Sequence, residues 1–347
     1  MDCSRLGVSV NLHILMIETF IKNHKTPLFR LTQFYQAFYR DFISSFDELF
    51  TWPKTLREEL KKEIPFSTIT SVSHLKSSDK STIKVLFKRL SDEKQFESVL
   101  IRHDDGRNTV CVSCMIGCPM GCVFCATGKM GFNGNLSDME IVDQVLDFAR
   151  ILKKEDRSVT NIVFMGMGEP LSNLENVWDA IKIFTDPRMF GMSMRRITIS
   201  TCGITPHLHK LITRGYKGRL ALSLHAPSQE LREKLIPIAA KFPLTELLAE
   251  FKEYAKITNK RVSYEYILIA DLNDQPKHAH ALARLLDPHL EHVNLIPYNP
   301  VQGLSFKRSS LASIQRFSNI LTKCKIQNTI RVTMGDDIKA ACGQLAG

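Results

Sequence analysis

Three cysteines in one short segment have the spacing of an iron–sulfur site. Cys118, Cys122 and Cys125 form a CxxxCxxC pattern. Such clusters are held by cysteine thiolates, usually four, so three thiolates can bind three irons of a 4Fe-4S cluster and leave the fourth iron for another ligand. Gly117 and Gly121 let the loop fold tightly around a bulky inorganic group. The pattern therefore predicts a cluster with one open iron.

A structural zinc site is an alternative use of these thiols. Zinc in such sites takes four protein ligands, typically as two separated pairs, and Cys114 would supply the fourth. The sequence has nine cysteines, and five of them fall within residues 111–125. An odd number, tight clustering and no secretory signal argue against a disulfide framework. We therefore expect a reduced, cytoplasmic environment.

A second signal, MGMGEP at residues 165–170, follows an apolar strand-like run. Gly168 at a strand end allows close backbone approach to a ligand, and the Glu169 carboxylate can accept hydrogen bonds from an ammonium group. Taken alone, the segment also fits a plain turn with an acid that caps the next helix. Beside the cysteine loop, a ligand-binding turn is the favoured interpretation.

Polar residues also stand at the ends of later strand-like runs. They are Ser200, the triplet Ser223-Leu224-His225, and Asn299. The carboxyl ends of strands in a βα fold converge on one mouth, where such residues can share a ligand. Taken singly, each is equally explained as a helix cap or a satisfied loop residue.

The C-terminal segment contains a further cysteine with small neighbours. Cys342 lies between Ala341 and Gly343, which leave room for access to its thiol. A single cysteine is usually a buried apolar residue. The alternative is a functional pair with Cys111, and composition does not decide between the two.

Strand-like and helix-like segments alternate from about Thr109 onward. The strand-like runs are Val110–Ile116, Asn161–Met167, Arg196–Thr201, Leu220–His225, Val262–Ile269, His292–Pro297 and Thr329–Met334. The amphipathic segments are Asp138–Leu152, Asn173–Phe184, Pro206–Thr213, Leu244–Ile257, Lys277–Leu286 and Ser309–Thr322. This alternation implies about seven βα units with a parallel sheet. The fold class is therefore α/β, a complete or partial (β/α) barrel with its chemistry at the carboxyl ends of the strands.

The chain before this region has a different organisation. Apolar residues at helical spacing predict helices over Leu6–Ile21, Thr32–Ile43 and Lys54–Glu63, and a mostly polar stretch without a predicted element follows over 71–81. Thr82–Leu90 and Phe96–Arg102 alternate apolar and polar residues, which predicts a β-hairpin. We divide the chain into a small N-terminal helical domain (1–70), a β-hairpin connector (71–103) and the barrel core (104–347).

The composition is that of a globular, basic protein. Hydrophobic residues make up 44% and charged residues 24%, which excludes a disordered chain. No run of about 18 uncharged apolar residues occurs, so no membrane span is expected. The sequence has 46 Lys and Arg against 36 Asp and Glu, a net charge of +10. This balance favours a polyanionic partner, nucleic acid first.

The cysteine loop followed by the glycine–glutamate turn resembles the radical S-adenosylmethionine (SAM) superfamily. Longer segments are similar to its RlmN/Cfr family, whose members methylate adenine carbons in RNA. These segments are CVSCMIGCPMGCVFCATGKMGFNGNL, NIVFMGMGEPLSNLENV, RRITISTCGI, LALSLHAPSQELREKLIPI, HVNLIPYNP and GDDIKAACGQLAG. The resemblance covers residues 96–347 nearly continuously. Residues 26–65 resemble the family's N-terminal RNA-contacting domain more loosely.

The resemblance implies a role for each candidate residue. The cluster ligands would be Cys118, Cys122 and Cys125. The SAM contacts would be Gly168, Glu169, Ser200, Ser223, Leu224, His225 and Asn299. Cys342 would carry the methyl group, Cys111 would resolve the intermediate, and Glu97 resembles the family's base. Two departures are visible: Glu97 lies one residue further from Cys111 than is usual, and Cys114 stands where a Ser is usual.

The resemblance also implies substrates and partners. RlmN-type members methylate adenine C2 in 23S rRNA and, for some members, in tRNA, whereas Cfr-type members methylate C8. The segments GEP (168–170), PYNP (297–300) and GDDI (335–338) look RlmN-type. We therefore expect C2 methylation of 23S rRNA, with tRNA as a further substrate. We also expect a flavodoxin-like or ferredoxin-like electron donor and a monomer.

Two other functions explain part of the pattern. A non-catalytic RNA-binding protein stabilised by zinc or a cluster would explain the charge and the cysteine loop, but not Glu169 or Cys342. A radical SAM enzyme with a small-molecule substrate would leave the pair Cys111 and Cys342 unexplained. Metal analysis separates the first alternative, because zinc without iron would favour it.

Overall fold

Ten strands form one sheet in the computed structural model, which describes residues 12–346. In sheet order they are β1 (Ile69–Lys76), β2 (Thr82–Arg89), β3 (Gln95–Arg102), β4 (Asn108–Val112), β7 (Asn161–Phe164), β8 (Ile197–Thr201), β9 (Arg219–Ser223), β10 (Val262–Leu268), β11 (Glu291–Pro297) and β12 (Gln327–Ile330). Pairs from β1 to β4 are antiparallel, and pairs from β4 to β12 are parallel. Because β1 and β12 are the two edges, the barrel is partial, which confirms the predicted fold class.

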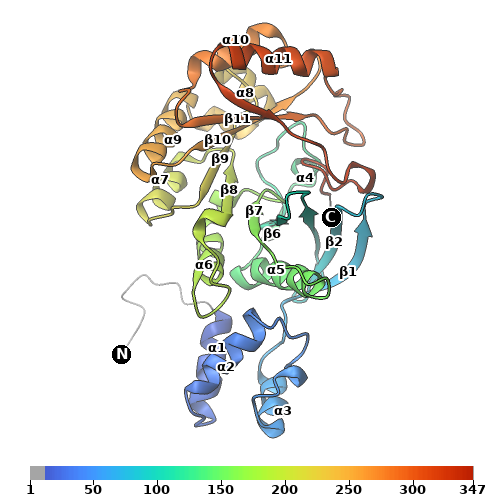
Figure 1. Cartoon of the computed structure of the whole chain (residues 1–347), viewed down its shortest axis with the longest axis vertical. Helices are drawn as coiled ribbons and strands as arrows, with labels where there is room; N and C mark the ends of the chain where they lie inside the picture. The colour runs from blue at the N-terminus through green and yellow to red at the C-terminus, as the bar shows by residue number, and fades with distance from the viewer. Residues whose placement is uncertain (1–11, 347) are drawn as a thin grey trace.

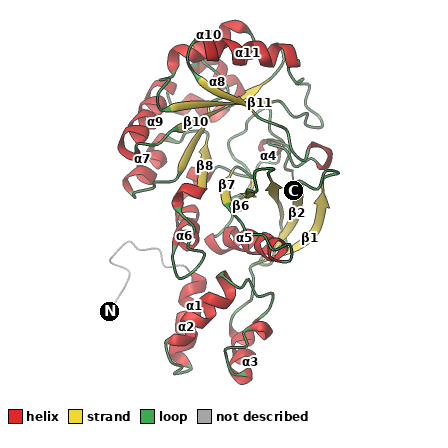
Figure 2. Cartoon of the chain, in the orientation of Figure 1, coloured by secondary structure: helices red, strands yellow, loops and turns green. Residues whose placement is uncertain are grey.

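Helices cover the outer face of the parallel strands (Figure 2). They are α5 (Asp138–Lys153), α6 (Leu174–Thr185), α7 (Thr205–Thr213), α8 (Gln229–Leu235), α9 (Leu244–Thr258), α10 (Pro276–Leu285) and α11 (Leu311–Lys323). In α9, Leu247 and Phe251 are one turn apart and fully buried, as expected for an amphipathic helix on a sheet. Each helix returns the chain, so the carboxyl ends of all the parallel strands open on the same side.

Three helices precede the sheet and lie at the lower end of the molecule (Figure 1). They are α1 (Leu12–Asn23), α2 (Phe29–Tyr39) and α3 (Lys54–Glu63). Their shared core is aromatic: Phe34 stacks on Phe38 with ring centroids 5.2 Å apart. The predicted α3 has the observed bounds, whereas α2 ends earlier than predicted and Phe42 adopts a positive φ of 50°. Residues 6–11 of the first predicted helix lie outside the described residues.

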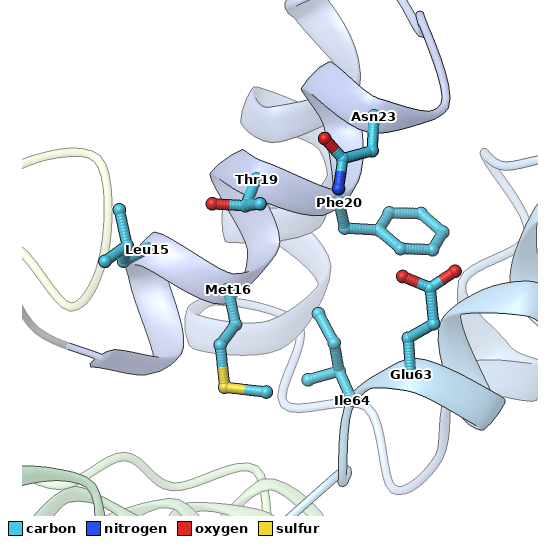
Figure 3. A pocket seen from close by; sticks show the side chains of 7 residues that line it. All are labelled: Leu15, Met16, Thr19, Phe20, Asn23, Glu63 and Ile64. Carbon is cyan, nitrogen blue, oxygen red and sulfur yellow. The ribbon is translucent and has the colours of Figure 1, made fainter.

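A hollow of about 240 Å³ lies between α1 and the end of α3 (Figure 3). Its lining is Leu15, Met16, Thr19, Phe20, Asn23, Glu63 and Ile64. These side chains are mainly apolar and include neither a thiol nor an imidazole. The hollow belongs to the N-terminal helices and lies at the end of the molecule away from β8–β11 (Figure 1).

The antiparallel end of the sheet differs from its prediction. The sequence assigns no element to the mostly polar stretch 71–81, but β1 extends into it as far as Lys76 and pairs with β2. After Ile69 every β1 side chain is exposed, so this edge strand has no apolar alternation to reveal it. The predicted hairpin is present as β2 and β3, and it is continuous with the main sheet. The last predicted strand, Thr329–Met334, is also shifted, because β12 ends at Ile330.

The division into three parts with the bounds 1–70, 71–103 and 104–347 stays a proposal. Within residues 12–346, no helix is both long enough and apolar enough to cross a bilayer.

Candidate active site

The cysteine loop lies between β5 (Met115–Gly117) and α4 (Ala126–Lys129). Gly117 begins it with a φ of 72°, and a Cβ there would lie 1.9 Å from the carbonyl oxygen of Gly131. Only glycine fits that approach, which allows the Cys118 N–H to donate to the same carbonyl at 2.9 Å. The sequence therefore closes the loop through a turn that no other residue type supports.

The three predicted cluster thiols are half-buried and lie within electrostatic reach of one another. Burial raises the pKa of the Cys118 thiol to about 12, and the negative charges of Glu169 and Cys125 add to this. Burial also raises the pKa of Cys122, with contributions from Cys125 and Cys118. A bound metal reverses this balance, because a coordinating thiol is deprotonated outright.

A buried positive charge beside the cysteine loop fits an anionic cluster. Among residues 12–346, no three His, Cys, Asp or Glu side chains are arranged for one ion. A cubane cluster instead offers each thiolate its own iron. Arg232 in α8 supports an anionic guest: it is fully buried, it interacts electrostatically with Cys122, and its Nε and Nη1 have no hydrogen-bond partner among the described residues. The donor set therefore fits a cluster held by three thiolates.

Glu169 is buried beyond the carboxyl end of β7, and its carboxylate is hydrogen-bonded to residues at the end of β8. Its Oε1 accepts hydrogen bonds from the Leu171 N–H at 3.0 Å and the Thr201 hydroxyl at 2.6 Å, and its Oε2 accepts from the Cys202 N–H at 2.8 Å. Burial raises the pKa of this carboxyl, and these hydrogen bonds oppose the rise. The Cys202 thiol is a fourth hydrogen-bond partner, so a ligand that binds this carboxylate would share or replace one of these donors. Glu169 is thus both the capping acid and a candidate ligand-binding group.

The strand-end residues predicted to bind SAM occupy one side of the barrel. The hydroxyls of Ser200 in β8 and Ser223 in β9 lie 3.4 Å apart. Leu224 is fully buried, and its N–H donates to the carbonyl of Glu265 at 3.0 Å, so its side chain belongs to the core. The serine pair therefore offers two neighbouring hydroxyls at the mouth.

His225 connects this strand end to the cysteine loop. Its Nδ1 accepts the Ile267 N–H at 3.0 Å, and its ring meets that of Phe124 edge-on at 5.0 Å. Burial, followed by the nearby charge of Arg232, lowers the pKa of His225 to about 3. The imidazole is therefore neutral at physiological pH and serves as an acceptor toward the backbone.

The C-terminal segment brings Cys342 to the same mouth. The Asn299 amide donates to the Cys342 carbonyl at 3.1 Å, and the Ala126 N–H donates to the Gly343 carbonyl at 2.8 Å. Cys342 is exposed, although the protein groups around it raise the pKa of its thiol by desolvation. Cys125 is among its electrostatic neighbours. The segment is therefore fastened beside the cysteine loop.

The thiols of Cys111 and Cys342 lie within electrostatic reach of each other. Cys111 lies in β4 and is buried, and burial raises the pKa of its thiol. The Cys342 thiol adds to that rise, which requires the two sulfur atoms to lie within electrostatic reach. The structure thus brings together the two cysteines that the sequence left as a candidate pair.

Glu97 in β3 faces the end of the chain. Its Oε1 lies 2.8 Å from Lys84 Nζ, and its Oε2 accepts the Ala346 N–H at 2.9 Å. Both carboxylate oxygens are therefore engaged.

The comparisons with known proteins agree with this geometry. Residues 112–283 match the model of the radical SAM superfamily. A crystal structure of a radical SAM methyltransferase from Sphaerobacter thermophilus is 41% identical, with a TM-score of 0.93, and the alignment covers 96% of this chain and 97% of that one. The probable dual-specificity RNA methyltransferase RlmN 2 of Protochlamydia amoebophila is 43% identical over 334 residues, 96% of this chain and 92% of the relative. The dual-specificity RNA methyltransferase RlmN of Marinobacter nauticus is 41% identical over 338 residues, 95% and 90% of the two chains.

The chain belongs to the RlmN family of radical SAM methyltransferases. This membership confirms the predicted family and enzyme class, and it removes the non-catalytic RNA-binding protein as an interpretation. RlmN relatives cover the N-terminal helices as well as the barrel, so the likeness extends beyond the superfamily core.

Sequence reasoning missed two charged residues at this RlmN-family site. Lys84 is buried in β2 against Glu97, and its only sequence signal is a lysine inside an alternating strand. Glu265 is buried in β10 and accepts the Asn294 amide at 2.7 Å. Desolvation raises the pKa of Glu265. A carboxylate in the middle of an apolar strand is the sequence signal that could have identified Glu265.

Proposed function

We propose that the protein methylates C2 of an adenine in RNA, in 23S rRNA and in tRNA, through a methyl group carried on Cys342. The observation that carries this proposal is that Cys342 lies within electrostatic reach of Cys111 and Cys125, on a segment hydrogen-bonded to Asn299 and to Ala126. RNA is the substrate named for the RlmN relatives, and the net charge of +10 supports a polyanionic substrate.

The binding roles follow from the donor sets. Cys118, Cys122 and Cys125 would hold a 4Fe-4S cluster. Gly168, Glu169, Ser200, Ser223, Leu224, His225 and Asn299 would surround SAM, with Leu224 contributing shape rather than a polar side chain. When bound, these two groups supply the radical chemistry and the methyl group that side chains lack. A flavodoxin-like or ferredoxin-like protein would donate the electron.

The chain's own residues would then carry out the remaining steps. Adenine C2 is not nucleophilic, so the Cys342 thiolate first accepts the methyl group as a thioether. Once that carbon is bonded to C2, Glu97 removes the C2 proton. The Cys111 thiolate then attacks Cys342 Sγ and a disulfide forms as the carbon–sulfur bond breaks; the electron pair of that bond passes to the adenine, whose new CH2 group takes up a proton to become the methyl group. A dithiol reductant restores both thiols.

The test is anaerobic reconstitution with iron and sulfide, followed by incubation with SAM, a reductant, and rRNA fragments or tRNA. Nucleosides are then identified by mass spectrometry. We expect 2-methyladenosine from the wild type and from Cys324→Ala, which changes an exposed cysteine at the end of α11, but none from Cys342→Ala. Formation of 8-methyladenosine would instead assign Cfr-type chemistry. Methyladenosine made by Cys342→Ala would refute the carrier role.

A further inference from the structure

Lys84 places a buried positive charge next to the C-terminal segment. Its side chain is 9% exposed, and its Nζ lies 2.8 Å from Glu97 Oε1 and 3.2 Å from the carbonyl oxygen of Lys339. A charge removed from water must be paired and hydrogen-bonded to be tolerated. Its only acceptor besides Glu97 in the described residues is that carbonyl, so Lys84 ties β2 to the beginning of the segment.

Glu97 ties the other end of the same segment. Lys84 pairs with Val99 and Leu86 pairs with Glu97 in the β2–β3 register, so the two charged residues are diagonal neighbours on one face. While Glu97 Oε1 contacts Lys84, its Oε2 accepts the N–H of Ala346. The pair therefore forms hydrogen bonds to both ends of residues 339–346, here called the carrier segment.

Cys342 lies in the middle of the carrier segment. Between the two gripped ends, the segment is held by the Asn299 amide on the Cys342 carbonyl and by the Thr127 hydroxyl on the Leu345 carbonyl at 2.6 Å. None of these contacts is made by the Cys342 side chain itself. The position of the thiol is thus set by backbone contacts on either side of it.

We propose that Lys84 and Glu97 form a latch that positions the carrier segment, with Lys84 as a positioning residue for Cys342. The idea rests on the proposed function, in which Cys342 carries the methyl group. It has a consequence for Glu97 as well. Lys84 and the Ala346 N–H each use one acceptor position on this carboxylate, so release of the end of the carrier segment would free a further position for a proton from RNA.

Hydrogen exchange measured by mass spectrometry tests the latch on the full chain without RNA or cofactor. In Lys84→Met, peptides covering 335–347 should exchange about tenfold faster than in the wild type, the change expected for losing a net hydrogen bond or two. The matched control is Lys88→Met in the same strand, where Lys88 forms an exposed ion pair with Glu93 at 3.2 Å. Equal exchange in Lys84→Met and Lys88→Met would overturn the proposal.

Two further variants keep the test decisive if Lys84→Met does not fold. Glu97→Gln keeps an acceptor for the Ala346 N–H but removes the ion pair, so its carrier segment must also exchange faster than the wild type. Lys84→Arg keeps the charge and the donors and should lie between Lys84→Met and the wild type. Unchanged exchange in Glu97→Gln would contradict the latch.

Activity measurements separate the latch from the proposed reaction. In reconstituted enzyme, Lys84→Met should lower kcat for RNA methylation with little change in the KM for RNA, and Lys88→Met should leave both unchanged. If the wild type makes no methyladenosine, the proposed function fails while the exchange result stands. If exchange is unchanged while Cys342→Ala abolishes the product, the latch fails alone.

Discussion

At the scale of single residues, the site combines thiols that their surroundings hold in the protonated form. Burial raises the pKa of Cys111, and the neighbouring thiol of Cys342 raises it further. A buried thiol is a poor nucleophile because only the thiolate attacks. In the proposed function, Cys111 would therefore act late, once bond formation at Cys342 has changed its surroundings.

Removing Cys111 should trap the intermediate before release. With no second thiolate to attack Cys342 Sγ, Cys111→Ala should remain covalently joined to RNA and give no free product. Denaturing electrophoresis with labelled RNA would show the adduct, and Cys324→Ala should show none. Free methylated RNA released by Cys111→Ala would contradict the resolving role.

His225 should make the protein sensitive to acid. Its pKa is lowered from 6.5 to about 3 in the folded state, so the fold favours the neutral ring. The contribution of the neutral His225 ring to the free energy of unfolding is fully present above pH 6.5. It falls by about 1.4 kcal/mol per pH unit as the pH drops toward 3. His225→Asn retains an acceptor for the Ile267 N–H and tolerates the φ of 56°.

Chemical denaturation of both proteins between pH 7 and pH 5 measures this difference. The free energy of unfolding of the wild type should fall more steeply with acid than that of His225→Asn. Parallel curves would show that another group controls the acid response.

At the scale of elements, the cysteine loop depends on one backbone turn. Gly117 and Gly131 approach so closely that the loop closes on itself between β5 and β6 (Phe132–Asn135). The helix α4 then starts directly after Cys125, and its Thr127 hydroxyl donates a hydrogen bond to the Leu345 carbonyl of the carrier segment. The loop therefore positions both the predicted cluster ligands and the chain end.

Gly117→Ala should damage this loop far more than Gly106→Ala damages its own turn. Both glycines have positive φ, which costs an L-residue about 1–2 kcal/mol. At Gly106 nothing lies within 4 Å of an added Cβ, whereas at Gly117 the Gly131 carbonyl oxygen lies 1.9 Å away. After reconstitution, Gly117→Ala should bind less iron per protein than Gly106→Ala. Equal iron contents would show that the turn is not needed to hold the ligands.

At the scale of the whole molecule, the N-terminal helices are joined to the barrel through α5. Asp143 Oδ2 accepts hydrogen bonds from the Ser67 hydroxyl at 2.9 Å and from the Thr68 N–H at 2.6 Å and hydroxyl at 2.7 Å. Arg150 donates to the Ile43 carbonyl at 2.9 Å. These contacts orient the helices on the barrel, and in the proposed function they would orient the RNA.

Asp143→Ala should loosen this joint. The loss of three hydrogen bonds to a charged acceptor should lower the free energy of unfolding by about 2–3 kcal/mol. Asp147→Ala, one turn along α5, is the control: burial raises the pKa of that carboxyl and its Oδ2 has no hydrogen-bond partner among the described residues, so its removal should cost less than about 1 kcal/mol. Equal losses in the two variants would show that Asp143 does not hold the joint.

The sequence by itself determined the fold class and most of the chemistry. The spacing of Cys118, Cys122 and Cys125 and the position of Glu169 after a strand are local properties, and alternating βα units place strand ends at one mouth whatever the details. The same local reasoning failed for β1, because an exposed edge strand carries no apolar period. It also left Lys84 unassigned.

Only the tertiary structure decided which distant residues meet. Cys111 and Cys342 are far apart along the chain, as are Glu97 and Ala346, which are 249 positions apart. Such contacts depend on how the open barrel curves and where the last segment returns across it, and no local periodicity encodes either. The role of the buried Lys84 charge becomes visible only in the folded chain, where Lys84 donates a hydrogen bond to the Lys339 carbonyl of that segment. Local spacing thus predicts the chemistry, whereas the way the chain closes around the mouth determines which distant residues contact one another.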